Sequence, residues 1–141
     1  MDRTDFELLG GGDRLRQIIH DFVDQVVADT MIGFHFRGVD VDRLKELEWQ
    51  LSARLLGADV PYEGRPLREA HARHPILGGQ FMRRQQILRD TLESHEVDPA
   101  IIGRWLEHNE SMRGLVTGDS GSDCDGEQAS AEAARVRERD D

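Results

Sequence analysis

The stretch DRLRQIIHDFVDQVV at residues 13–27 decides the fold class. Its large apolar side chains recur at spacings of three and four residues, at Leu15, Ile18, Ile19, Phe22, Val23, Val26 and Val27. This spacing places them along one face of an α-helix, while the charged residues between them face water. We therefore predict an amphipathic helix here, with Asp13 as its N-terminal cap.

A short helix is predicted upstream of this stretch. Thr4-Asp5-Phe6-Glu7 has the pattern of a capping box, in which a threonine and a glutamate satisfy the free backbone amides of the first helical turn. The glycines at residues 10–12 end this helix, because glycine readily adopts the backbone conformations that a helix end needs.

Further helices are predicted downstream, after a link over residues 29–40. Three of them are long and begin at Asp40 or Asp42, near residue 79 and at Asp98-Pro99. Between the first two, a short helical turn is predicted at residues 67–72, and Pro75 breaks it. The inward-facing residues of the three long helices are Leu44, Leu47, Leu51 and Leu55, then Phe81, Leu88 and Leu92, then Ile101, Ile102, Trp105, Leu106, Met112 and Val116. Since no stretch shows the two-residue alternation of a half-buried strand, we predict an all-α fold.

Glu48 interrupts the apolar stripe of the helix predicted after Asp40. It follows Leu44 by four residues and precedes Leu51 by three. An ionised carboxylate that faces a core is costly unless it is paired. Two interpretations stay open: the stripe borders a polar cavity, or Glu48 leans out to solvent at the edge of the stripe.

Composition limits the class of protein and its partners. The chain has 141 residues, a formal net charge of -10 and one cysteine, Cys124. The acidic balance argues against nucleic acid or an anionic membrane as a partner. No apolar run approaches the roughly 18 residues of a membrane span, and the first residues lack a signal-peptide pattern. We expect a cytoplasmic protein with no disulfide inside the chain.

Two regions are expected along the chain. Residues 1–116 form one folded domain, whereas residues 117–141 are rich in Gly, Ser, Asp and Glu and have few large apolar groups. A segment of that composition cannot bury enough surface to fold, so we expect a disordered acidic tail. Cys124 lies in this tail and is interpreted as an incidental thiol.

Several motifs occur in an order that resembles the truncated haemoglobin family. FELLGGG at residues 6–12 resembles the family's opening helix, FRG at 36–38 with RLK at 43–45 resembles the link into the distal helix, and PYEGRPLREAH at 61–71 resembles the segment before the proximal histidine. The resemblance covers about residues 5–116, and the ordered set is far more specific than any single piece. It implies the two-over-two helical globin sandwich that encloses heme b.

The resemblance implies that His71 is the proximal ligand of the heme iron. Heme requires a wide apolar pocket, one neutral imidazole and limited access on the other side. His74 is the nearby alternative, but Pro75 and Ile76 align better when His71 is the ligand. The family's heme contacts map onto Phe22, Phe36, Leu44, Leu67 and Phe81. His35 lies either near the heme edge or in solvent, and we favour solvent.

The distal residues implied by the resemblance are unusual. Val23 falls where many members have a tyrosine that donates to oxygen, Leu44 at the distal gate, and Glu48 where a glutamine is common. Arg84 falls on the helix that borders the pocket, where an apolar or aromatic residue is usual. A valine cannot hydrogen-bond and an ionised glutamate can only accept, so this departure argues against classical oxygen storage.

The resemblance implies a globin that reversibly binds oxygen, nitric oxide and carbon monoxide, with nitric oxide detoxification or oxygen transport as roles. The alternatives are a peroxidase-type heme enzyme that uses a distal carboxylate, and a heme-based sensor. Whether the protein is an enzyme stays open. We expect diatomic gases and an unidentified reductase as partners, no membrane or nucleic acid partner, and a monomer or weak homodimer.

Overall fold

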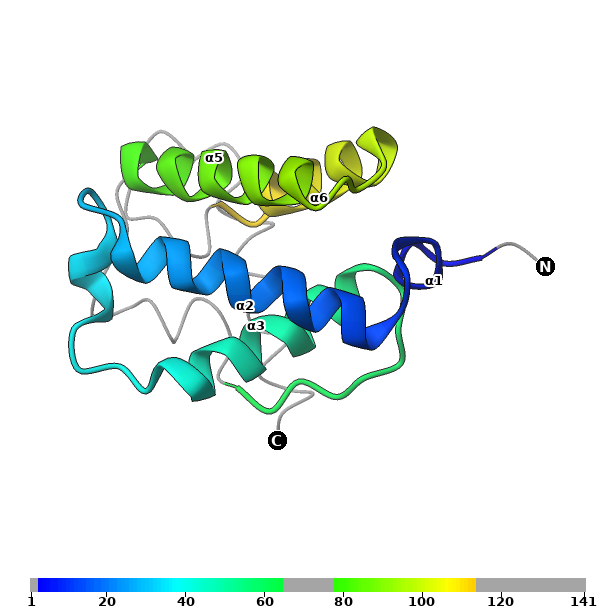
Figure 1. Ribbon diagram of the computed structural model, residues 1–141, viewed down its shortest axis with the longest axis horizontal. Coiled ribbons are helices and arrows are strands. Elements are labelled where there is room, and N and C mark those ends of the chain that lie inside the picture. The colour runs from blue at the N-terminus through cyan, green and yellow to red at the C-terminus, as the bar shows by residue number, and fades with distance from the viewer. Residues whose placement is uncertain (1–2, 65–77, 114–141) are drawn as a thin grey trace.

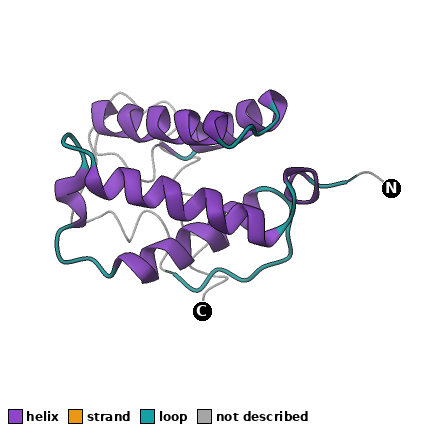
Figure 2. Ribbon diagram, viewed as in Figure 1, coloured by secondary structure: helices purple, strands orange, loops and turns teal. Residues whose placement is uncertain are grey.

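The computed structural model describes residues 3–64 and 78–113 of the chain. Within these ranges every regular element is a helix (Figure 2). The elements are α1 (Asp5–Leu9), α2 (Gly12–Ala28), the 3-10 helix η1 (Gly33–Phe36), α3 (Val41–Leu55), α5 (Gly78–Ser94) and α6 (Pro99–Ser111). The all-α prediction is confirmed.

The four long helices form two packed pairs. The central helix α2 packs against α3 on one side and against α5 on the other, and α6 packs against α5 (Figure 1). The short helix α1 lies at the N-terminal end of α2. None of the described helices is long and apolar enough to cross a membrane.

The core forms where the predicted apolar faces meet. All the predicted inward residues of α2 are buried except Val27, which is half-buried. Phe81, Leu88 and Leu92 of α5 are at most 3% exposed, and Ile101, Ile102, Trp105 and Leu106 of α6 are buried as well. The periodicity of α2, α5 and α6 therefore identified their buried faces.

Three helix starts carry the predicted caps. The Thr4 hydroxyl accepts a hydrogen bond from the Glu7 amide at 3.2 Å, the Asp40 carboxylate accepts from Arg43 N at 3.1 Å, and Asp98 accepts from Ala100 N at 2.8 Å. The predicted cap at Asp13 is wrong. Helix α2 begins at Gly12 after Gly11, whose φ of 86° is a conformation that favours glycine, so Asp13 lies within the first turn.

The helix α3 differs from its prediction. Leu44, Leu47, Leu51 and Leu55 are only half-buried, while Ala53 and Leu56 enter the core. The reason is that Leu51 and Leu55 border a cavity rather than tightly packed core. The turn predicted at residues 67–72, Pro75, Val116 and the tail with Cys124 lie outside the described residues.

Candidate functional site

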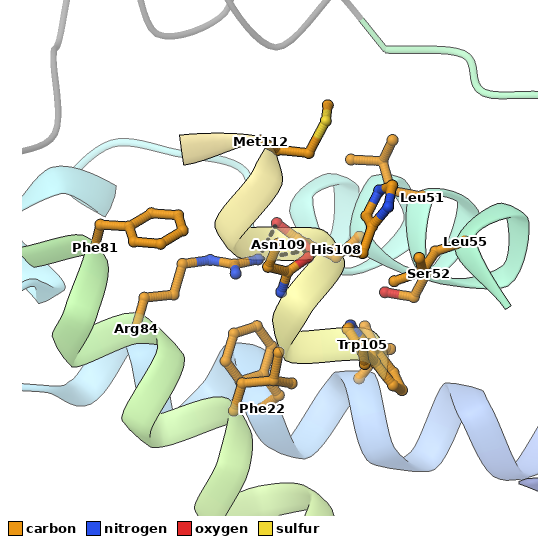
Figure 3. A pocket seen from close by; sticks show the side chains of 13 residues that line it. Phe22, Leu51, Ser52, Leu55, Phe81, Arg84, Trp105, His108, Asn109 and Met112 are labelled. Carbon is orange, nitrogen blue, oxygen red and sulfur yellow. Dashed lines mark hydrogen bonds and ion pairs between the residues drawn. The ribbon is translucent and has the colours of Figure 1, made fainter. Parts of the chain in front are cut away.

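A cavity of about 150 Å³ lies between the two helix pairs and has walls from α2, α3, α5 and α6 (Figure 3). Most of its described wall is apolar and consists of Ile19, Phe22, Leu51, Leu55, Phe81, Leu88, Trp105 and Met112. The polar part of the wall consists of Glu48, Ser52, Arg84, His108 and Asn109. An apolar hollow with a few polar groups is typical of a ligand or cofactor site.

The apolar wall is made of side chains that the helices hold firmly. Phe22 of α2 is 2% exposed, Phe81 of α5 is 3% exposed and Trp105 of α6 is 2% exposed. Each belongs to the periodic face that buries its helix, so the same pattern that builds the core also builds this wall. Phe22 and Phe81 were predicted as heme contacts, and the structure brings both to one cavity.

The charged residues of the cavity form an ion pair. Nη2 of Arg84 lies 3.1 Å from Oε2 and 3.3 Å from Oε1 of Glu48, across 36 residues of sequence. The Arg84 guanidinium carbon also lies 5.0 Å from the centroid of the Phe22 ring, a cation–π distance. Both side chains are about one-quarter exposed, at 25% and 23%. Of the two interpretations of Glu48, the one with a polar cavity agrees with this geometry, because Arg84 compensates the carboxylate.

Other predicted site residues do not line the described wall of this cavity. Val23 is buried in the core at 2% exposure, and Phe36 and Leu44 are half-buried where η1 and the first turn of α3 lie. His71 and Leu67 lie outside the described residues. The roles predicted for these five residues stay predictions.

His35 has a different environment from the one favoured by the sequence. It is half-buried, and its Nε2 atom shares a hydrogen bond of 3.1 Å with Oε1 of Gln80 on α5. Its ring centroid lies 4.1 Å from that of Phe34. His35 therefore links η1 to α5 and is not simply a solvent-facing side chain.

Sequence reasoning missed part of the polar wall. Ser52, His108 and Asn109 line the cavity without having been singled out, and of these His108 is exposed. Asn109 is held in place because its Nδ2 atom donates to Oε1 of Gln85 at 3.2 Å. Helical spacing was the available signal, since Ser52 follows Glu48 by four residues and Asn109 follows Trp105 by four.

The cavity suits a flat apolar prosthetic group. Aromatic and aliphatic side chains from four helices can cover the faces of a porphyrin, and Arg84, His108 and Asn109 add polar groups to the wall. Within the described ranges no three His, Cys, Asp or Glu side chains group closely enough to hold a metal ion by themselves. Two helix pairs stacked around such a cavity are the arrangement implied by the resemblance to the truncated haemoglobin family.

The chain belongs to the bacterial-like globin family, whose family model matches residues 4–117. It is 30% identical over 76 residues to a group 1 truncated haemoglobin of Mycolicibacterium paratuberculosis, a match that covers 54% of this chain and 56% of that protein. It is 27% identical over 109 residues to a group 1 truncated haemoglobin of Tetrahymena pyriformis. That match covers 75% of this chain and 90% of the relative.

Solved structures agree with this assignment. The crystal structure of the truncated haemoglobin from Tetrahymena pyriformis in its Fe(III) form superimposes with a TM-score of 0.78 and 26% identity, and covers 83% of this chain and all of that one. The 2/2 haemoglobin of a Synechococcus species shares the fold. Its TM-score is 0.77 at 21% identity, and the match covers 83% of this chain and all of that one. The two-over-two helical sandwich is therefore confirmed.

Proposed function

We propose that this chain binds heme b through His71 and holds oxygen, nitric oxide or carbon monoxide reversibly at the heme. Heme, when bound, supplies the iron atom at which such a diatomic ligand attaches. The single observation that carries the proposal is the apolar cavity between the helix pairs of a chain that belongs to the globin family. Glu48 and Arg84, which form an ion pair, bring opposite charges to the described wall of this cavity.

The apolar side chains would hold the porphyrin and keep water out. Phe22, Phe81 and Trp105 present ring surfaces to the cavity. We propose that Phe36, Leu44 and Leu67 complete the contacts, as the family pattern implies. Burial of a large flat apolar group stabilises the complex by removing this surface from water.

The polar side chains would set ligand choice. Val23 and Leu44 offer no hydrogen bond, whereas Arg84 can only donate and an ionised Glu48 can only accept. We propose that this pair replaces the tyrosine and glutamine that are common in the family. Oxidation of nitric oxide to nitrate by dioxygen, with one electron per turnover from an unidentified reductase, is the turnover that we propose for a monomer or weak homodimer in the cytoplasm.

Absorption spectroscopy tests the proposal directly. The purified protein should show a Soret band that shifts when carbon monoxide, oxygen or nitric oxide is added. His71→Ala should abolish tight heme uptake or change the ferrous spectrum, because the proximal imidazole is lost. His74→Ala serves as the matched control and should keep the parent spectrum. A normal five-coordinate histidine signature in His71→Ala would assign the ligand to His74 instead.

A peroxidase-type reaction is the second candidate. It is favoured by the position of Arg84, whose guanidinium group reaches the cavity and contacts Glu48. A carboxylate can move a proton during cleavage of a peroxide bond, and a neighbouring cation can stabilise the developing negative charge. Peroxide-dependent oxidation of a phenolic dye should then fall in Glu48→Gln at unchanged heme content. An equal rate in the parent and in Glu48→Gln would remove this candidate.

A further inference from the structure

Arg84 has hydrogen-bond donors that Glu48 does not use. A guanidinium group carries five N–H donors, at Nε, Nη1 and Nη2. Both contacts to Glu48 come from Nη2, at 3.1 and 3.3 Å. Within the described ranges neither Nε nor Nη1 of Arg84 has a hydrogen-bond acceptor. The group therefore presents free donors at the cavity wall.

The surroundings of Arg84 make these donors effective. In Figure 3 its side chain extends from α5 across the cavity toward Asn109 of α6, with the Phe22 ring below it. The neighbouring wall residues Phe81 and Leu88 are apolar and buried. A donor beside such a wall has less water to bond to, so an acceptor in the cavity gains more from it than it would in bulk water.

Glu48 positions the guanidinium group without occupying it. The carboxylate meets only the Nη2 corner, so it fixes the direction of the planar group and leaves its other edge free. A ligand that contacts Nε or Nη1 therefore meets the positively charged guanidinium group of the ion pair and not the carboxylate. An anion on this edge would lie closer to the guanidinium charge than to the carboxylate charge, so attraction exceeds repulsion.

We infer that Arg84 is a specificity-determining residue of this cavity and donates to a small anionic ligand at the heme, so that the site prefers small anions over neutral carbon monoxide. This inference rests on the proposed function, because the ligand is held at the bound heme. Charge-assisted hydrogen bonds are stronger than neutral ones, and carbon monoxide is a poor acceptor with no net charge.

Equilibrium titration of the ferric protein with cyanide tests the inference. Arg84→Gln should bind cyanide roughly ten- to a hundredfold more weakly than the parent, the loss expected for one hydrogen bond to a charged group. Affinity of the ferrous protein for carbon monoxide should change much less. Arg89→Gln is the matched control, because Arg89 is exposed on the same helix and lies outside the cavity wall. It should keep the parent affinity for cyanide.

The C–O stretching frequency of the carbon monoxide complex gives a readout that does not depend on affinity. A positive donor near the ligand oxygen increases back-donation from the iron and lowers this frequency. The frequency should therefore rise in Arg84→Gln and stay unchanged in Arg89→Gln. Glu48→Gln retains an acceptor oxygen for Nη2 and removes the negative charge, so its cyanide affinity should equal or exceed that of the parent.

The outcomes separate the inference from the proposed function. Parent values of both cyanide affinity and C–O frequency in Arg84→Gln, or an equal loss of affinity in Arg89→Gln, would overturn the inference while heme binding stands. Absence of a Soret band from the parent would instead overturn the proposed function. If Arg84→Gln does not take up heme, Arg84→Lys replaces it in the cyanide titration. Lysine keeps the positive charge but lacks the planar fork of donors. This variant should then bind cyanide more weakly, and parent-like affinity would contradict the inference.

Discussion

Glu48 illustrates how one residue can depart from the pattern of its helix. A carboxylate on an apolar stripe would destabilise a closed core, and it is tolerated here because the stripe faces a cavity and Arg84 supplies the opposite charge. Both groups keep about a quarter of their surface exposed, which reduces the cost of removing them from water. The ion pair therefore belongs to the site more than to the core.

Replacement of Glu48 by glutamine is expected to slow the release of oxygen. Removal of the negative charge and addition of an amide donor should both favour oxygen, whose bound form carries partial negative charge. One neutral hydrogen bond corresponds to a rate change of roughly two- to tenfold if the whole gain appears in dissociation. Stopped-flow measurement of oxygen release from the parent and from the variant at neutral pH checks this.

Glu46→Gln is the control for this substitution. Glu46 lies on the same helix and pairs with Arg16 at 2.9 Å, but it does not line the described cavity wall. Its replacement should leave oxygen release unchanged. Equal rates of oxygen release for Glu48→Gln and the parent would show that Glu48 does not act on the ligand.

The turn between α2 and η1 depends on a glycine at position 33. The Gly33 amide donates to the Asp29 carbonyl oxygen at 2.8 Å, and the Asp29 carboxylate accepts from the amides of Met31 and Ile32 at 2.9 and 3.2 Å. A Cβ atom on Gly33 would clash with the backbone carbonyl oxygen of Val27. Backbone cannot move away as a flexible side chain can, so this element tolerates only glycine here.

Gly33→Ala should therefore lower the free energy of unfolding by about 1–3 kcal/mol, the usual cost of overpacking. Gly103→Ala is a matched substitution in the interior of α6, where an added Cβ meets no atom within 4 Å. It should raise the free energy of unfolding by roughly 0.5–1 kcal/mol, because glycine is a poor helix former. Urea unfolding of both variants, followed by circular dichroism, checks the pair; a Gly33→Ala protein as stable as the parent would contradict the clash.

The helices α1 and α6 are joined by a bidentate ion pair. Nε and Nη2 of Arg104 lie 2.8 and 2.7 Å from the two carboxylate oxygens of Asp5. Hydrogen bonding to the Arg104 guanidinium holds the pKa of the Asp5 carboxyl below its ordinary value of 3.8. A lowered pKa in the folded state stabilises the protein above the unfolded pKa, and this contribution is lost as pH falls through the lowered value.

Asp5→Asn should consequently be less stable than the parent at neutral pH, and the difference should shrink as pH falls below 3.8. The effect should be small and sensitive to salt, because Arg104 is more than half exposed. Urea unfolding at neutral and at acidic pH measures it. A difference that persists undiminished at acidic pH would show that ionisation of Asp5 is not its cause.

At the scale of the whole molecule, the family match and the described helices cover the same part of the chain. The globin family matches residues 4–117, and α6 ends at Ser111. Residues 117–141 lie outside the described residues, so their disorder stays a prediction from composition.

Truncation after Val116 should therefore leave heme binding intact. The removed segment has few large apolar groups that could pack on the domain. The Soret spectrum and the heme affinity of the shortened protein should match those of the full chain. A large loss of heme affinity would show that residues 117–141 contribute to the folded domain.

The sequence by itself determined the helices and, except for α3, their buried faces. Caps such as those at Thr4, Asp40 and Asp98 join groups two or three residues apart, and the apolar periodicity of α2 extends over adjacent turns. Such interactions form within one element, so a local pattern is enough to predict them. The ordered motifs also predicted the globin family correctly, while the roles of His71 and Leu67 depend on residues outside those described.

Only the tertiary structure decided which of these residues meet. Glu48 and Arg84 are 36 residues apart, and Asp5 and Arg104 are 99 apart, so no local pattern joins either pair. Likewise Ser52 and Asn109 share a cavity wall with Phe22, whereas Val23, its neighbour in sequence, is buried away from that wall. The physical reason is that adjacent residues of a helix point in directions about 100° apart, and packing of the helices decides which direction faces core, cavity or solvent.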